Sequence, residues 1–248
     1  MSEYIKISSL SLMFGPHTVL EDVSLNISKG KFTSIVGPNG GGKSSLIKII
    51  LGLIMPSSGG IMIDGYNPQQ LESRYFGYVP QLKTADRSFP ATAVELVASG
   101  IEANWLTRLN GKLLNDSMEA LRKVSAENLA DKQLSKLSGG ELQRIYLARS
   151  IARKPKILLL DEPATGIDSA SENDLNNILE QIREETHTTV IMVTHDWETA
   201  YHHSDKVIIL NKNVICSDTP EKAFTDEVLR IAFGHEGHKH KMIFGARH

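Results

Sequence analysis

Residues 37–44 read Gly37-Pro38-Asn39-Gly40-Gly41-Gly42-Lys43-Ser44 and lie between the β-branched run Phe32–Val36 and a helical apolar pattern at Lys43–Leu53. This order of strand, Gly-rich loop and helix fits the pattern G-x-x-x-x-G-K-[ST]. Glycines let backbone N–H groups converge on phosphate at the N-terminus of a helix, where the helix dipole favours anions. We expect Lys43 to reach the β- and γ-phosphates of a nucleotide and the Ser44 hydroxyl to ligate Mg²⁺.

The elements on either side of this loop predict an α/β fold. Before it, runs at 4–12 and 19–27 are predicted strands, and after it come a short hairpin strand at 59–65 and a strand at 75–79. From about residue 91 to residue 137 the pattern is helical. Helix and strand then alternate, at 141–152, 157–160, 171–185, 189–193 and 206–210. The alternation predicts a parallel sheet covered on both faces, with a β-rich start and a helical insertion.

Composition is that of an ordinary globular protein. The 248 residues are 41% hydrophobic and 23% charged, with a formal net charge of −2, so the chain has no general electrostatic footprint for nucleic acid. The longest apolar runs are far below the roughly 18–20 residues that span a bilayer, and the N-terminus has no secretory pattern. The lone Cys216 fits a reducing compartment and is expected to be a small, buried apolar residue.

A second motif supplies carboxylates. The apolar strand Ile157–Leu160 is followed by Asp161 and Glu162. Asp161 is placed to orient Mg²⁺ and its waters, and Glu162 to act as general base toward an attacking water. An apolar strand that ends in acids is common on its own, but together with the phosphate loop it predicts nucleotide hydrolysis.

The third motif, Leu137-Ser138-Gly139-Gly140-Glu141-Leu142-Gln143-Arg144, lies shortly before that strand. A helix N-cap explains Ser138 but not the two glycines, which favour a second anion site at a helix N-terminus. With the other two motifs, the chain resembles the ABC ATPase family over nearly its whole length. The resemblance implies a P-loop NTPase (RecA-like) core with an antiparallel β subdomain and a helical insertion subdomain. It also implies a head-to-tail homodimer that holds two ATP molecules, with Ser138, Gly139 and Gly140 closing on the γ-phosphate bound by the partner subunit.

Four further positions match the family pattern. The resemblance implies that Phe14 stacks on adenine, that Gln81 contacts Mg²⁺ and water, that Gly166-Ile167-Asp168 couples the two sites, and that His195 contacts the γ-phosphate. Taken alone, Phe14 would be a core residue and His195 a structural histidine. Ser45, where the family more often has Thr, and Gly41, where it has a small residue, are minor departures that remove no catalytic group.

The spacing of the motifs favours a transporter subunit. Only a compact helical subdomain, about residues 82–140, fits between Gln81 and Ser138, which excludes the long coiled-coil insertion of DNA-repair relatives. A single phosphate loop excludes the relatives with two cassettes in one chain. We expect an ABC ATPase domain at 1–234 and a His-containing tail at 235–248, which as a mobile solvated terminus need not bind metal.

The cargo is predicted from a weaker resemblance. Residues 89–100, 166–168 and 211–234 look like those of bacterial zinc and manganese importer ATPases. Importers of siderophores or other small solutes share parts of this pattern. A soluble, non-transport ABC ATPase and a nucleotide sensor without turnover stay as alternatives, the latter disfavoured by Glu162 and His195.

The resemblance also implies the partners. We expect a polytopic membrane permease to dock near Gln81 and residues 82–92, and an extracytoplasmic solute-binding protein to act indirectly. The chain would then lie peripherally on the cytoplasmic face of the cell membrane, with no nucleic acid partner.

Overall fold

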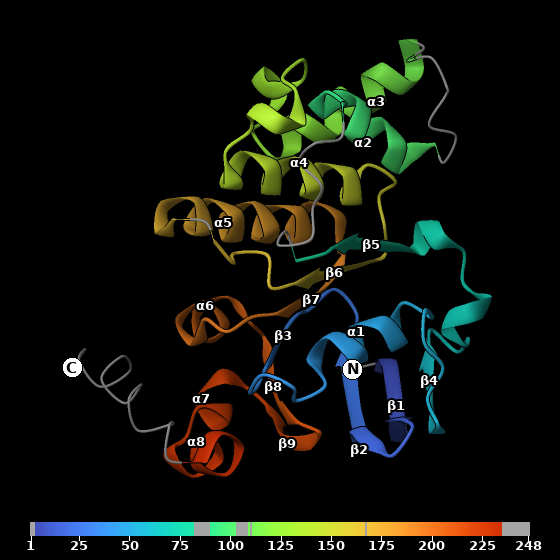
Figure 1. Ribbon diagram of the computed structural model, residues 1–248, viewed down its shortest axis with the longest axis vertical. Coiled ribbons are helices and arrows are strands. Elements are labelled where there is room, and N and C mark those ends of the chain that lie inside the picture. Colours follow the sequence, from blue (N-terminus) through green and yellow to red (C-terminus); the bar gives the residue numbers. More distant parts are fainter. Residues whose placement is uncertain (1–2, 82–89, 103–108, 110, 167, 235–248) are drawn as a thin grey trace. The chain divides into compact units, whose positions relative to one another are not determined.

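The computed structural model describes residues 3–81, 90–102, 109, 111–166 and 168–234. It forms two compact units, one made of residues 1–72 and 191–248 and the other of residues 73–190 (Figure 1). Residues 82–89 of the predicted docking segment at 82–92, Ile167 and the tail at 235–248 lie outside the described residues.

An antiparallel sheet opens the first unit. Its order is β2-β1-β4, made of β1 (Glu3–Phe14), β2 (His17–Ser28) and β4 (Ser58–Ile63). Alternate residues of β1 such as Ile5 and Ile7 are buried and pair with Ile27 and Leu25 of β2. This period-2 pattern is the reason that the strands could be predicted from sequence, and the antiparallel β subdomain is confirmed.

Parallel strands carry the phosphate loop in the same unit. β3 (Phe32–Val36) pairs in parallel with β8 (Lys206–Asn211), which pairs antiparallel with β9 (Asn213–Asp218), and β3 leads into α1 (Lys43–Ile50). All five residues of β3 are buried, as expected of a strand covered on both faces. β9 was not predicted, because its residues are only partly buried and give no clear apolar alternation.

Three short helices close this unit around Trp197. They are α6 (Trp197–His203), α7 (Pro220–Ala223) and α8 (Asp226–Phe233). The Trp197 ring lies 4.9 Å from the ring of Phe233 and 5.9 Å from that of Phe224, measured between centroids. The rings pack with Val36 and Ile209 in one apolar cluster. The ends of β3 and β8 are therefore held together near the phosphate loop.

The second unit combines a strand pair with the helical insertion. β5 (Phe76–Val79) pairs in parallel with β6 (Ile157–Asp161), and β7 (Thr189–Val193) leads the chain back to the first unit. The helices are α2 (Ala93–Ile101), α3 (Gly111–Lys123), α4 (Gly139–Ile151) and α5 (Ser169–Thr186). α2, α3 and α4 pack on one another (Figure 1). The predicted helical character of this stretch is confirmed.

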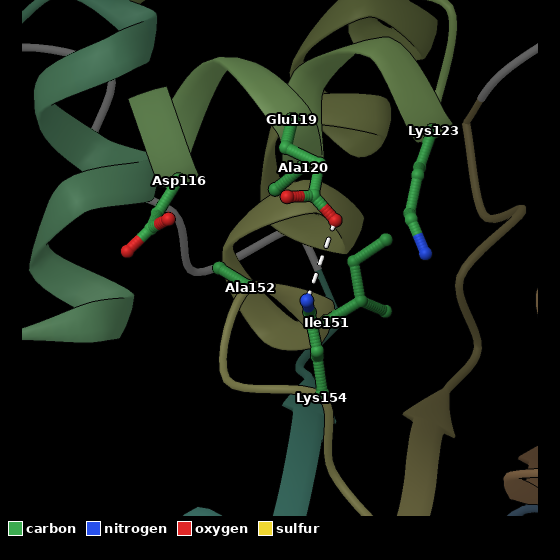
Figure 2. A pocket seen from close by; sticks show the side chains of 7 residues that line it. All are labelled: Asp116, Glu119, Ala120, Lys123, Ile151, Ala152 and Lys154. Carbon is green, nitrogen blue, oxygen red and sulfur yellow. Dashed lines mark ion pairs between the residues drawn. The ribbon is translucent and has the colours of Figure 1, made fainter. Parts of the chain in front are cut away.

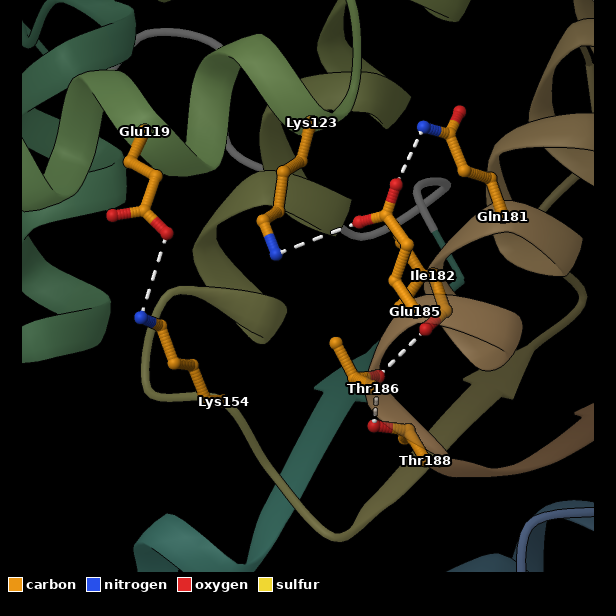
Figure 3. A network of polar contacts seen from close by, with 8 residues as sticks. All are labelled: Glu119, Lys123, Lys154, Gln181, Ile182, Glu185, Thr186 and Thr188. Carbon is orange, nitrogen blue, oxygen red and sulfur yellow. Dashed lines mark hydrogen bonds and ion pairs between the residues drawn. The ribbon is translucent and has the colours of Figure 1, made fainter.

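Exposed polar contacts tie α3 to its neighbours. Lys123 lies 3.8 Å from Glu185 of α5, and Glu119 lies 3.4 Å from Lys154 beyond α4 (Figure 3). Beside them lies a cavity of about 120 Å³ lined by Asp116, Glu119, Ala120, Lys123, Ile151, Ala152 and Lys154 (Figure 2). None of the predicted site residues lines it. Because exposed ion pairs contribute only about 0–1 kcal/mol, these contacts add little to the stability of the unit.

Within the described residues, no helix is both long and apolar enough to cross a membrane.

Candidate nucleotide-binding and hydrolysis residues

Steric contacts with β8 and β2 explain three glycines of the phosphate loop, Gly37, Gly41 and Gly42. A Cβ on Gly37 would overlap the Leu210 carbonyl oxygen, and one on Gly41 would lie 2.9 Å from the same atom. Gly42 has φ 92°, and a Cβ there would meet the Leu20 side chain. The loop is therefore pressed against its own unit on one side, and only glycine allows this path.

Lys43 and α1 complete the loop. Lys43 is 6% exposed, and its Nζ donates to the carbonyl oxygens of Gly37, at 2.8 Å, and Pro38, at 2.9 Å. The ammonium group thus lies inside the curve of the loop. α1 begins at Lys43, so the N–H groups of its first turn, including those of Ser44 and Ser45, have no acceptor within the helix. A loop of this shape, with a buried cation and a helix N-terminus, fits a polyphosphate.

Phe14 and His195 belong to the same unit. Phe14 ends β1, faces His17 across the hairpin and is 52% exposed, so its ring is not used in the core. His195 follows Thr194, whose backbone N–H donates to Ile35 at 3.3 Å, and its side chain is exposed. The two residues therefore do not have the buried, purely structural surroundings that each would be assigned if taken alone.

The second unit brings Gln81 and Glu162 together. Gln81 Nε2 donates to Glu162 Oε2 at 2.6 Å. Glu162 itself has φ 49°, in the left-handed region that non-glycine residues rarely adopt, directly after the buried strand β6. Such strain is retained where the surrounding structure needs one side-chain direction. Asp161, at the end of β6, is 7% exposed. Burial, and secondarily the charge of Asp161, raise the pKa of Tyr78.

Thr165 also contacts Glu162, and this residue was not predicted from the sequence. Its Oγ1 lies 3.4 Å from Glu162 Oε2, the oxygen that also accepts from Gln81, and its N–H donates to the Glu162 carbonyl oxygen. A Thr three residues after an acid in a turn was the available signal, because Ser and Thr hydroxyls commonly bond to nearby groups in turns.

Ser138 caps α4. Its Oγ accepts from the Glu141 N–H at 3.2 Å, and the Glu141 carboxylate accepts from the Ser138 N–H at 2.7 Å. Lys132 Nζ lies 2.9 Å from the same carboxylate. The Ser138 N–H first, and Lys132 second, hold the pKa of Glu141 below its usual value. This capping box accounts for Ser138 and Glu141 in purely structural terms.

Gly140 needs a different explanation, which α5 supplies. A Cβ on Gly140 would lie 2.8 Å from Ser171 Oγ. Ser171 in turn donates through its N–H and its Oγ to Asp168, the N-cap of α5, at 3.0 and 2.9 Å. These bonds hold the pKa of Asp168 below its usual value. The Ser138–Gly140 segment therefore lies beside the first turn of α5, whose N-cap is Asp168.

The predicted site residues divide between the units. Phe14, the phosphate loop and His195 lie in the first. Gln81, Asp161, Glu162, Asp168 and the Ser138–Gly140 segment lie in the second.

Comparison with known proteins gives the family. The family model described as ABC transporter matches residues 20–165. The chain belongs to the ABC transporter ATPase family. It is therefore an ATP-binding, ATP-hydrolysing protein with the P-loop NTPase fold, as the sequence predicted.

Two curated relatives of this ABC ATPase are close to it in length. The zinc import ATP-binding protein ZnuC of Photorhabdus laumondii is 36% identical over 248 residues, covering 100% of this chain and 90% of the relative. ZnuC of Vibrio vulnificus is 40% identical over 222 residues, covering 89% of this chain and 78% of the relative.

Solved structures agree on the fold. cbiO1 from Clostridium perfringens, described as part of the ABC transporter complex cbiONQ, has a TM-score of 0.80 at 26% identity. The match covers 97% of this chain and 100% of that one. A dimeric ATP-binding cassette in a post-hydrolysis state, bound to ADP and Pi, has a TM-score of 0.76 at 29% identity, covering 87% of this chain and 98% of that one.

Proposed function

We propose that this ABC ATPase energises zinc import through a separate membrane permease. The observation that carries the cargo is the similarity to relatives named zinc import ATP-binding proteins, at 36% identity over 100% of this chain and 40% identity over 89% of it. The chain's own motifs supply the hydrolytic chemistry, and the proposal assigns zinc recognition to no residue of this subunit.

The phosphate loop binds the nucleotide. Its backbone N–H groups, Lys43 and the N-terminus of α1 hold the phosphates, and the exposed Phe14 ring stacks on the adenine. The oxygen donors Ser44, Asp161 and Gln81 are the kind of ligand that Mg²⁺ prefers. The ion neutralises charge on the phosphates when it is bound.

Glu162 performs the proton transfer. Its carboxylate accepts a proton from the attacking water, while Gln81 and Thr165 fix its orientation through Oε2. His195 contacts the γ-phosphate from the end of β7. A positioned general base contributes about 10²- to 10⁴-fold in rate, which sets the scale of the loss expected when Glu162 is neutralised.

Two copies act together. The dimeric cassette at 29% identity supports a homodimer. In this homodimer, as the family resemblance implies, Ser138–Gly140 of one copy closes on the nucleotide of the other and Asp168 connects the two sites. ATP binding closes the dimer and hydrolysis opens it, and the helical insertion carries this motion to the permease. The chain lies peripherally on the cytoplasmic face of the membrane, and an extracytoplasmic binding protein delivers zinc to the permease.

Reconstitution tests the proposal. The chain is placed in liposomes with its permease and binding protein, and phosphate release is followed with zinc, manganese or iron. We expect zinc to stimulate hydrolysis, and the Glu162→Gln complex to give neither basal nor stimulated release. Stimulation by manganese alone or by iron alone would identify that metal as the cargo in place of zinc. A rate of hydrolysis that none of the three metals changes would contradict the assignment of a metal cargo.

A further inference from the structure

Gln143 is a buried amide for which the described structure provides no hydrogen-bond partner. Its side chain lies on α4 and is 1% exposed. Among the described residues, neither Nε2 nor Oε1 has an acceptor or donor within hydrogen-bonding distance. Buried side-chain amides are nearly always paired, because an unpaired one loses its bonds to water without replacement. This residue therefore needs an explanation other than packing.

Its position on α4 indicates which element it serves. Gln143 follows Gly140 by three residues, so the two lie on neighbouring positions of the same helix face. That face contacts α5, because a Cβ on Gly140 would lie 2.8 Å from Ser171 Oγ. The amide is thus placed one turn along α4 from the contact between the Ser138–Gly140 segment and the start of α5.

The first turn of α5 holds groups that such an amide can pair with. α5 begins at Ser169 with Asp168 as its N-cap, and the Asp168 carboxylate accepts from the Ser171 N–H and Oγ. The Ala170 N–H also interacts with the Asp168 carboxylate. The Ser169 N–H has no acceptor within the helix, as in any first turn. An amide oxygen is a good acceptor for such donors.

We propose that Gln143 is a positioning residue that pairs with the first turn of α5 when the ATP-bound dimer closes. The inference rests on the proposed homodimer, and it adds a connection between the Ser138–Gly140 segment and the turn that follows Asp168. In the open chain the unpaired amide is destabilising, and closure removes this penalty by giving it a partner. Gln143 therefore favours the closed state over the open one, although it touches neither nucleotide nor permease.

The test compares Gln143→Met with a matched control. Methionine keeps the length and helix propensity of glutamine but has no amide. Thr33→Val is the control, because Thr33 is 1% exposed and its Oγ1 likewise has no partner among the described residues, while it lies on β3 in the first unit. Both variants are made in the wild-type and Glu162→Gln backgrounds. Thermal unfolding without nucleotide and dimerisation at saturating ATP are measured.

We expect Gln143→Met to raise the unfolding midpoint and to weaken ATP-dependent dimerisation. Its unfolding midpoint rises, because an unpaired polar group is removed from the interior, while its ATP-dependent dimerisation weakens by about tenfold, the scale of an ordinary hydrogen bond. Thr33→Val shows the rise alone. A purely structural role of Gln143 would change the unfolding midpoint and leave ATP-dependent dimerisation unchanged, as for Thr33→Val.

Two results would overturn the inference. If Gln143→Met lowers the unfolding midpoint, the amide is already paired in the open chain, for instance by an internal water. If it raises the midpoint and leaves dimerisation unchanged, the amide plays no part in closure. Failure of the Glu162→Gln parent to dimerise would instead contradict the proposed homodimer, so the two failures are distinguishable.

Discussion

Gln81 Nε2 donates a 2.6 Å hydrogen bond to Glu162 Oε2, and the register of the two strands that precede these residues explains why they meet. Val79 of β5 pairs with Leu160 of β6 in a parallel ladder. Gln81 and Glu162 each follow two residues later, so both side chains leave the sheet at the same edge. The parallel pairing of the two strands thus places the glutamine beside the acid, although the two residues are far apart in the sequence.

Neutralising this acid should stop hydrolysis and spare binding. Glu162→Gln keeps the side-chain shape but cannot accept a proton, so we expect phosphate release to fall by about 10²- to 10⁴-fold while ATP affinity is retained. Release assays and nucleotide titration measure the two quantities. Glu119→Gln, an exposed acid of α3, is the matched control and should leave both unchanged. Turnover by Glu162→Gln at the wild-type rate would assign the general base to another group.

Removing the donor should have a smaller effect on the rate than removing the acid. Gln81→Ala deletes the contact on Oε2, while Thr165 Oγ1 still lies 3.4 Å from that oxygen. We expect a decrease in kcat of about tenfold, and a larger decrease when Thr165→Val is added, because orientation of the carboxylate is then lost from both sides. Single-turnover hydrolysis measures each step. Equal rates for the single and double variants would show that Thr165 does not orient Glu162.

The exposed ring of Phe14 gives a test of nucleotide stacking. Phe14→Ala should weaken ATP binding by about tenfold, because stacking of a base on an aromatic side chain contributes roughly 1–3 kcal/mol. The neighbouring Met13 is exposed to a similar extent, 48% against 52%, so Met13→Ala is the control for a lost apolar side chain. Fluorescent nucleotide titration separates them. An equal loss of affinity in both variants would argue against a specific stacking role for Phe14.

The sequence predicted most reliably those features that local physics imposes. The Gly-rich loop was predicted from its G-x-x-x-x-G-K-[ST] spacing between a strand and a helix. The strand predicted at Ile157–Leu160 came from its continuous apolar run, and the structure extends it to Asp161. The bond between Gln81 and Glu162 could not be predicted, because it depends on strand register between segments 81 residues apart. The left-handed backbone of Glu162 could not be predicted either, because non-glycine residues rarely adopt a positive φ. The same holds for the unpaired amide of Gln143, because buried polar groups are nearly always hydrogen-bonded.

The packing of Gly140 on Ser171 predicts a compensating pair of substitutions. Gly140→Ala introduces a methyl group 2.8 Å from Ser171 Oγ, so we expect destabilisation by about 1–3 kcal/mol from overpacking. Ser171→Ala removes that oxygen, and the double variant should recover part of the loss. A double-mutant cycle from chemical unfolding gives the coupling energy, which we expect to be about 1 kcal/mol. Additive effects would mean that α4 and α5 adjust independently at this contact.

The capping box of α4 predicts a pH-dependent contribution to stability. The pKa of Glu141 is lowered in the folded chain below its ordinary value, first by the Ser138 N–H and second by Lys132. A lowered folded pKa means that the contribution is fully present above the unfolded pKa and is lost as the pH falls through the folded one. Glu141→Gln should therefore reduce the free energy of unfolding at about pH 7, and the difference from wild type should shrink as the solution is acidified below the unfolded pKa. Urea titrations at several pH values measure this difference. Lys136→Gln, two residues before the N-cap Ser138 and outside the box, is the control. A difference between Glu141→Gln and wild type that stays constant with pH would show that the Glu141 charge does not contribute.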